Sequence, residues 1–269
     1  MLYMLRYSEI GLKSTRVRMQ WENFLINDIK KACNFYGIDA SIKKIDGRIV
    51  IEGGKFIEEI LREVGGIRSF SPVMLTSVDL KEIVEKVREY SSFIKENESF
   101  ALRVRKAGKH EYSSRDVAVI AGEAVRNERK AKVNLDEPEH EIFIEIRHSH
   151  AFIFKEIIDG IGGLPYGSQG KVISFVEDMQ DIKAAWLMVR RGCYVDFALS
   201  CSCEDEIKEM MKWRRHTIFY CNSIHEAEKI ALQNNAKAIV TGKNEFIKLS
   251  LPVFYPLLGE EYVRNDVMK

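Results

Sequence analysis

The stretch DGIGGLPYGSQGKVISFVEDMQD, residues 159–181, decides how the C-terminal part of this chain folds. A glycine-rich loop leads into KVISFV, a β-branched and aromatic run typical of a buried strand, and a helix start follows. From there to residue 242, strand-like runs alternate with helix-like runs. This alternation predicts βαβ crossovers and a Rossmann-like, mainly parallel sheet.

The helix start at FVEDMQD, residues 175–181, lies where a ligand would bind, because ligands of open parallel sheets sit beyond the carboxyl ends of the strands. A phosphate needs glycines and free backbone amides at such a place. Glu177 and Asp178 put two negative charges there instead. Asp178 is a good N-cap and Asp181 suits the first turn, so we expect a well-capped structural helix.

Residues 78–165 form a second predicted unit of two amphipathic helices and three strands. In SFALRVRK, residues 99–106, the alternation places apolar side chains on one face and Arg103 and Arg105 on the other. With Lys106 and Lys109 in the following loop, these arginines predict either a cationic platform or an ordinary solvated strand face.

Residues 1–77 predict a ferredoxin-like unit. A strand, a helix with apolar residues at one-face spacing from Val17 to Ile29, a hairpin, a short helix and an extended run follow in that order. Asp46-Gly47 is the pair that a two-residue type I′ hairpin favours. The chain is thus expected to hold three domains, at 1–77, 78–165 and 166–269, of mixed α/β and α+β class.

Composition narrows the class of protein further. The chain lacks an uninterrupted apolar stretch of about 18 residues and a signal-peptide pattern, so we expect no membrane association and a cytoplasmic location. Five cysteines predict reduced thiols, and the Cys201/Cys203 pair lacks zinc-finger partners. We assign no catalytic residue, no metal and no cofactor from the sequence.

Four segments resemble one family: YSEIGLKSTRVRMQWENFL, FALRVRKAGKHEYSSRDVAVIAGEAV, KVNLDEPEHEIFIEIR and GIGGLPYGSQGKV. In this order they are similar to the tRNA 4-thiouridine synthetases, which also serve thiamine synthesis. The resemblance implies an N-terminal ferredoxin-like domain, an RNA-binding THUMP domain and an ATP pyrophosphatase (PP-loop) domain. The family's SGGxDS loop falls at residues 176–181, where none of its serine or glycine positions is kept. We therefore expect a degenerate PP-loop that does not adenylate RNA.

The resemblance also implies an acceptor cysteine beyond the segment that matches residues 241–266, and in many members a rhodanese-like domain. The sequence given ends at Lys269, and Cys201 and Cys203 match neither family cysteine, so we expect no sulfur relay here. Three functions stay open. The chain could bind tRNA or another structured RNA without catalysis, act as a divergent tRNA sulfurtransferase with separate sulfur carriers, or serve as a partner subunit.

Charge distribution selects the candidate RNA-binding residues. Residues 103–132 carry a net charge of +5 and residues 1–48 a net charge of +4, although the whole chain carries only +1. We expect the Lys and Arg side chains of these two segments to bind RNA phosphates. The candidates are Lys13, Arg16, Arg18, Arg103, Arg105, Lys106, Lys109, Arg115, Lys130 and Lys132. A homodimer, or a heteromer with a catalytic tRNA-modifying enzyme, is the expected alternative assembly.

Overall fold

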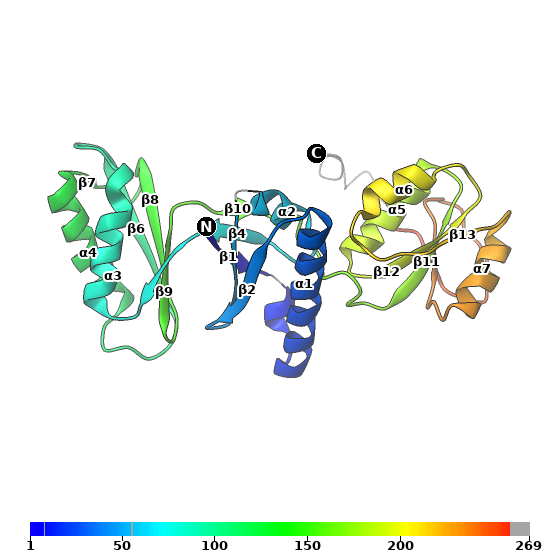
Figure 1. The fold of residues 1–269 in the computed structure, drawn as a ribbon, viewed down its shortest axis with the longest axis horizontal. Helices are drawn as coiled ribbons and strands as arrows, with labels where there is room; N and C mark the ends of the chain where they lie inside the picture. The colour runs from blue at the N-terminus through cyan, green and yellow to red at the C-terminus, as the bar shows by residue number, and fades with distance from the viewer. Residues whose placement is uncertain (8, 55, 259–269) are drawn as a thin grey trace. The chain divides into compact units, whose positions relative to one another are not determined.

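The computed structural model describes residues 1–7, 9–54 and 56–258 (Figure 1). The chain forms two compact units, and each draws on several segments of the sequence. The first comprises Met1–Arg6, Ala40–Lys55 and Ser69–Asp159. The second comprises Tyr7–Asp39, Phe56–Arg68 and Gly160–Lys269. The strands of the ferredoxin-like domain therefore belong to the first unit and its helices to the second.

The ferredoxin-like sheet is antiparallel, with the strand order β10-β4-β1-β3-β2. The predicted hairpin is confirmed, since Asp46 and Gly47 adopt φ values of 48° and 77° and join Ile45 to Arg48. The strands are β1 (Leu2–Arg6), β2 (Ala40–Ile45), β3 (Arg48–Gly53), β4 (Ser69–Pro72) and β10 (Ile158–Asp159).

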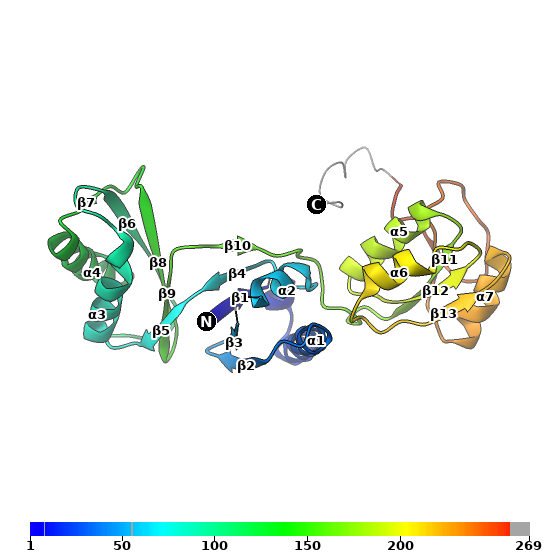
Figure 2. The same cartoon turned by 45° about the horizontal axis from the view of Figure 1, so that its top comes forward.

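The second sheet of the first unit is that of the expected THUMP domain, with the order β5-β9-β8-β6-β7. Figures 1 and 2 place α3 and α4 on one side of it, where their apolar faces share a buried core with the strands. The elements are β5 (Met74–Ser77), α3 (Leu80–Tyr90), a 3-10 turn (Ser91–Phe93), β6 (Ser99–Lys106), α4 (Ser114–Arg129), β7 (Lys132–Val133), β8 (His140–Ile146) and β9 (His150–Phe154).

The extended run predicted at residues 67–78 is divided between the two sheets of this unit. β4 ends at Pro72 in the ferredoxin-like sheet, and β5 begins at Met74 in the THUMP sheet. Between them, the backbone N–H of Val73 still donates to Leu2 O at 2.8 Å. One continuous extended segment thus contributes a strand to each sheet, which alternation alone does not reveal.

The third sheet is all-parallel, as the alternation of strands and helices predicted, with the order β13-β12-β11-β14-β15. α5 and α6 share one apolar core with it, and α7 packs in a second core on the opposite face. The elements are β11 (Lys171–Val176), α5 (Met179–Arg190), β12 (Tyr194–Leu199), α6 (Glu204–Met211), β13 (Ile218–Tyr220), α7 (Ile224–Gln233), β14 (Ile239–Val240) and β15 (Val253–Phe254).

The helices of the ferredoxin-like domain bind the third domain within the second unit. They are a 3-10 turn (Glu9–Leu12), α1 (Thr15–Phe35) and α2 (Ile57–Glu63). The indole Nε1 of Trp213 donates to the buried Asp28 of α1 at 3.0 Å, and Arg214 donates to Glu63 O at 2.7 Å. In the third domain, α6 ends at Met211, since Lys212 at φ 45° turns the chain and buries Trp213 and Arg214.

The glycine-rich linker contains glycine where its backbone lies directly against the end of α5. At Gly163, with φ at +72°, an added Cβ would meet Arg190 O at 2.2 Å. Leu164 N donates to the same carbonyl at 2.9 Å, so the linker backbone packs directly on the end of α5. Across the described residues, the helices are too short or too polar to cross a membrane.

Candidate functional site

Four arginines from different segments of the first unit gather around one carboxylate. Glu145 on β8 is 9% exposed and accepts from Nε of Arg48 at 2.8 Å and from Nε of Arg147 at 2.7 Å. Arg105 on β6 is the register partner of Glu145. Arg6, at the end of β1, lies with its guanidinium 4.6 Å from the ring centre of Phe154. We call Arg6, Arg48, Arg105 and Arg147 the arginine cluster.

The arginine cluster carries more positive charge than Glu145 neutralises. Burial lowers the pKa of Arg6 to about 10; the Glu145 charge opposes this shift and those of Arg48 and Arg105 add to it. Nη1 of Arg6 donates to Ser71 Oγ at 3.0 Å, but Nη2 has no hydrogen-bond acceptor among the described residues. Guanidinium groups with charge that is not neutralised and with an N–H donor that has no acceptor suit a phosphate, whose oxygens accept from planar pairs of N–H donors.

Glu145 itself is held ionised. Burial raises the pKa of Glu145, yet the hydrogen bond from Arg48 and the charges of Arg48, Arg147 and Arg6 outweigh it, so that the net shift is downward. The sequence did not single out Arg6, Arg48, Glu145 or Arg147. Arg6 and Arg48 were marked only by the basic charge of residues 1–48, and Glu145 and Arg147 lie outside that segment and share no motif with them.

The structure separates the predicted THUMP cations into two groups. Arg105, Lys106, Lys109 and Arg115 belong to the carboxyl end of β6, its following loop and the first turn of α4. Lys130 and Lys132 belong to the opposite end, because Lys132 pairs with Ser99 at the start of β6. An eight-residue strand separates the two groups by roughly 25 Å. The predicted set is therefore not one site.

Arg103 lies less open to solvent than the alternation suggested. Its Nε donates to Glu141 at 2.7 Å and its Nη2 donates to Leu135 O at 2.9 Å. The charge of Arg103 is thus neutralised by a neighbouring strand. Arg105, two residues on, is exposed and joins the arginine cluster instead.

The predicted cations near the N-terminus lie in the second unit. Nζ of Lys13 sits 4.9 Å from the ring centre of Trp21, and Nε of Arg18 pairs with Glu22 at 3.0 Å. Arg16 is exposed on the first turn of α1. Two of these three side chains, Lys13 and Arg18, therefore already have partners on α1.

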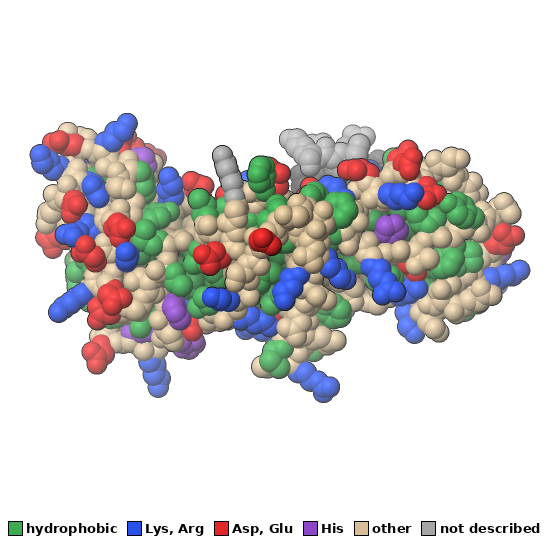
Figure 3. Space-filling model, viewed as in Figure 1, with side chains coloured by type: hydrophobic (Ala, Val, Ile, Leu, Met, Phe, Trp, Pro, Cys, Tyr) green, Lys and Arg blue, Asp and Glu red, His purple; other side chains and the backbone are tan. Residues whose placement is uncertain are grey.

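The outer faces of α3 and α4 do not form a cationic surface. Figure 3 shows positive and negative side chains interspersed over this part of the molecule. Arg88 contacts both Glu85 at 2.6 Å and Glu128 at 3.3 Å, and Arg126 pairs with Glu123 at 3.4 Å. Arg88 and Arg126 are consequently paired with carboxylates on these faces and do not add to the cations at the carboxyl end of β6.

At the carboxyl end of β11, the predicted helix cap is confirmed as a capping box. Oδ1 of Asp178 accepts from Gln180 N at 2.8 Å and from Asp181 N at 3.3 Å. Oδ2 of Asp181 accepts from Glu177 N at 2.9 Å and from Asp178 N at 3.3 Å. These four backbone amides therefore already donate to carboxylates of the chain itself.

The second carboxylate oxygen of Asp181 accepts hydrogen bonds at the end of the neighbouring strand, β14. Asp181 is 1% exposed, and its Oδ1 accepts from Thr241 Oγ1 at 2.9 Å and from Gly242 N at 2.6 Å, just after β14. Lys243 forms an ion pair with Glu177 across the same point. A Cβ at Gly242 would lie 2.5 Å from the backbone of Gln180. The place where the strand order reverses, between β11 and β14, is filled by these contacts.

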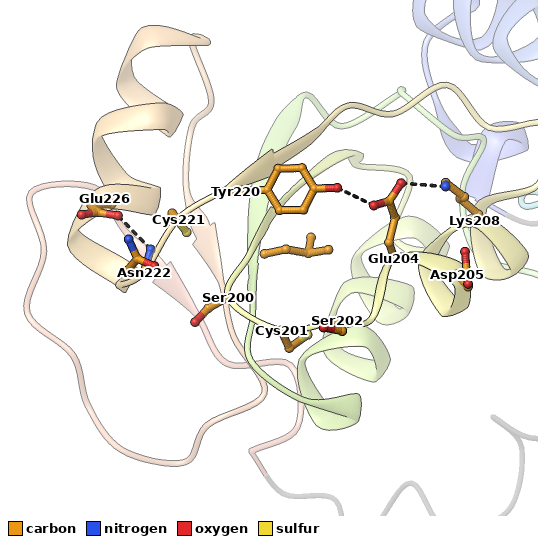
Figure 4. Close-up of a pocket in the computed structure, with 11 residues that line it drawn as sticks. Ser200, Cys201, Ser202, Glu204, Asp205, Lys208, Tyr220, Cys221, Asn222 and Glu226 are labelled. Atoms are coloured by element: carbon orange, nitrogen blue, oxygen red, sulfur yellow. Dashed lines mark hydrogen bonds and ion pairs between the residues drawn. The ribbon is translucent and has the colours of Figure 1, made fainter.

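A cavity of about 690 Å³ lies one strand away, beyond β12 and β13. Figure 4 shows Tyr220, Glu204 and Lys208 joined in a chain on one side of it and Asn222 with Glu226 on the other. Its lining comprises Leu199, Ser200, Cys201, Ser202, Glu204, Asp205, Lys208, Tyr220, Cys221, Asn222 and Glu226.

Cys201, at this cavity, is joined to Cys203 by a disulfide. The prediction that all five cysteines are reduced thiols is therefore wrong, because the turn after β12 brings these two α-carbons within 5.5 Å. Cys33, Cys193 and Cys221 are buried free thiols. Within the described ranges, no group of three or more His, Cys, Asp or Glu residues is arranged to hold a metal ion.

The fold and these sites define a protein with a ferredoxin-like domain, a THUMP domain and an all-parallel α/β domain. The sequence model of the ThiI ferredoxin-like domain matches residues 2–71, and that of the THUMP domain matches residues 77–156. A tRNA sulfurtransferase of Sulfurisphaera tokodaii, described as probable, is 30% identical over 302 residues, which cover 93% of this chain and 80% of the relative. The chain belongs to the ThiI-like tRNA sulfurtransferase family.

Two further comparisons agree with this assignment. A relative from Methanobrevibacter smithii with the same description is 39% identical over 205 residues, and the match spans 73% of this chain but about half, 52%, of the relative. A crystal structure of a Pyrococcus horikoshii protein superposes with a TM-score of 0.82 at 26% identity and covers 98% of this chain and 97% of its own.

The fold is shared with a 4-thiouridine synthetase. The crystal structure of that enzyme in complex with RNA and with bound ATP superposes with a TM-score of 0.71 at 20% identity. The superposition covers 95% of this chain and 80% of the synthetase.

Proposed function

We propose that this protein binds tRNA through the first unit and serves tRNA thiolation. The observation that carries the proposal is the arginine cluster, where one buried carboxylate accepts from Arg48 and Arg147, interacts with the charge of Arg6 and has Arg105 as its neighbour on the next strand. RNA helices are recognised mainly through phosphates, 2′-hydroxyls and shape. A cationic surface of fixed geometry, without a base-reading motif, suits that mode of binding.

Arg105 connects the arginine cluster to the other cations of the proposed interface. It lies opposite Glu145 in the sheet and is followed by Lys106 and by the exposed Lys109. The proposed RNA surface thus runs from the arginine cluster along the carboxyl end of β6 to Arg115. Family relatives described as tRNA sulfurtransferases, and a structural neighbour solved with RNA, support tRNA as the ligand.

For the catalytic step, we propose as the first candidate that this chain does not itself adenylate tRNA. The four amides at the start of α5 donate to Asp178 and Asp181, and Glu177 adds a further negative charge that Lys243 already neutralises. A triphosphate does not fit this loop as it stands, because its oxygens would need the same donors. Catalysis would then come from a partner enzyme.

The second candidate is a sulfurtransferase that acts on tRNA with separate sulfur carriers. It is favoured by the family relatives, which carry that name, and by the fold shared with a 4-thiouridine synthetase that binds ATP. In this case the loop at residues 176–181 would have to release its internal hydrogen bonds, or the nucleotide would bind elsewhere.

One titration separates these candidates from each other and from a protein without RNA function. Fluorescence anisotropy of a labelled tRNA is followed at several salt concentrations, with and without ATP, and pyrophosphate release is measured in parallel. We expect binding that weakens steeply with salt and is insensitive to ATP, with no pyrophosphate. Pyrophosphate release that depends on tRNA would establish the second candidate. An absence of binding at low salt would refute the RNA interface.

A further inference from the structure

The disulfide between Cys201 and Cys203 links residues that are only two positions apart in the loop from β12 to α6. A crosslink over so short a loop removes little freedom from the unfolded chain. Its contribution to stability is therefore small compared with that of a disulfide that closes a long loop. Its position at an open cavity points to chemistry instead.

The two sulfur atoms are not equivalent. Cys201 lines the cavity, whereas Cys203 does not and instead occupies the N-cap position of α6. The Cys203 side chain caps no backbone amide there. A nucleophile that enters the cavity would thus reach the sulfur of Cys201, and the sulfur of Cys203, which does not line the cavity, would be the leaving group.

The charge of the cavity determines which nucleophile can enter. Glu204, Asp205 and Glu226 line it together with a single cation, Lys208. Lys208 pairs with Glu204 at 2.6 Å, and Tyr220 donates to the same carboxylate, so Asp205 and Glu226 are not neutralised by a cation of the lining. The attacking thiolate carries no net charge when it comes from a cationic thiol, one negative charge from a neutral thiol and two from an anionic thiol, so repulsion by this wall increases in that order.

We propose that this disulfide is an exchange site for small neutral or cationic thiols. The thiolate of the incoming molecule attacks Sγ of Cys201, the S–S bond breaks, and Cys203 leaves as a thiolate that takes up a proton. A second thiol then attacks the mixed disulfide. Two thiols are oxidised to one small disulfide, and the protein pair is reduced to two thiols. The site is distinct from the proposed RNA interface and does not rest on it.

The first test is a thiol count on the full chain, denatured without reductant and again after reduction. The proposal expects three thiols before reduction, from Cys33, Cys193 and Cys221, and five afterwards. A count of five before reduction, in protein purified without reductant, would overturn it.

The second test compares reduction rates with cysteamine, 2-mercaptoethanol and thioglycolate, which are cationic, neutral and anionic. Each rate is divided by the rate of the same thiol with a small neutral disulfide. At low salt, we expect cysteamine to react roughly tenfold faster than thioglycolate, and the ratio to fall as salt is added. The Asp205→Asn variant should reduce the ratio. Equal normalised rates for the three thiols would contradict the assigned cavity.

The third test uses the inequality of the two cysteines. Cys203→Ser leaves the cavity-lining sulfur, and with cystamine it should form a mixed disulfide at Cys201 that mass spectrometry detects. Cys201→Ser leaves only the sulfur at the start of α6 and should react much more slowly. Comparable trapping in both variants would overturn the assigned direction of attack, and the circular dichroism of each variant verifies that it is folded.

Discussion

Nε of Arg48 lies 2.8 Å from Oε1 of Glu145, although the two residues are 97 positions apart in the sequence. Arg48 begins β3 in the ferredoxin-like sheet, and Glu145 belongs to β8 in the THUMP sheet. The same carboxylate accepts from Arg147. Through this ion pair, the two sheets of the first unit share one charged centre, and that centre belongs to the proposed RNA surface.

Glu145→Gln should lower the free energy of unfolding by about 1–3 kcal/mol, because Arg48 and Arg147 lose a charged, largely buried acceptor. The exposed pair of Arg103 with Glu141 offers a matched control, and Glu141→Gln should cost less than about 1 kcal/mol. Urea unfolding measures both. Equal effects of the two substitutions would show that burial of Glu145 contributes nothing.

The same variant has a pH signature. The pKa of Glu145 is lowered in the folded protein from an ordinary value of 4.5. A carboxylate whose pKa is lower in the folded state stabilises the fold fully at pH values above its unfolded-state pKa. This stability is lost as the pH falls through its folded-state pKa. We therefore expect the difference between wild type and Glu145→Gln to be constant near neutral pH and to shrink below about 4.5. A difference that grows in acid would contradict this assignment.

Arg105→Ala, Lys106→Ala and Lys109→Ala, combined, should weaken tRNA binding and reduce its salt dependence, because phosphate contacts release counterions when they form. Each lost contact should lower the slope of log affinity against log salt by about 1. The control is Arg126→Ala, Lys130→Ala and Lys132→Ala, which removes the same charge at the other end of the domain. Equal losses in both triple variants would show a nonspecific charge effect and not a defined surface.

Asp181→Ala should destabilise the protein by about 2–4 kcal/mol, because Thr241 and the backbone amides of Glu177 and Gly242 lose a buried acceptor. Asp178→Ala removes only a helix cap and should cost about 1 kcal/mol. Thermal or urea unfolding gives both values. If Asp178→Ala were the more harmful substitution, Asp181 would not be the residue that closes the strand ends.

Asp28→Asn should remove a pH dependence of stability. Burial raises the pKa of Asp28 above its ordinary value of 3.8, while the charge of Arg214 and the hydrogen bond from Trp213 oppose the shift. A raised carboxylate pKa means that the folded state binds the proton more tightly, so stability falls as pH rises from the unfolded to the folded value. An asparagine oxygen can still accept from Trp213. We expect a flatter profile of unfolding free energy against pH in the variant, and parallel profiles would refute this account.

Local patterns in the sequence were enough for much of the fold. The Asp46-Gly47 hairpin, the Asp178 cap and the alternation of strands and helices after residue 170 all depend on residues within a few positions of each other. Such interactions are fixed by backbone geometry and helix or strand periodicity. The same short-range motifs, in their order along the chain, carried the family resemblance.

The tertiary structure decided what the charges and cysteines do. Arg6, Arg48 and Arg105 come from separate segments and reach Glu145 only when the first unit folds, whereas Arg147 follows Glu145 by two residues. Likewise, strand direction placed Lys130 and Lys132 at the opposite end of β6 from Lys106, which a count of charges could not show. Charge acts over a few ångströms and follows spatial neighbours. The sequence therefore determined the domains and their local elements, and the packing of distant segments decided which side chains form a site.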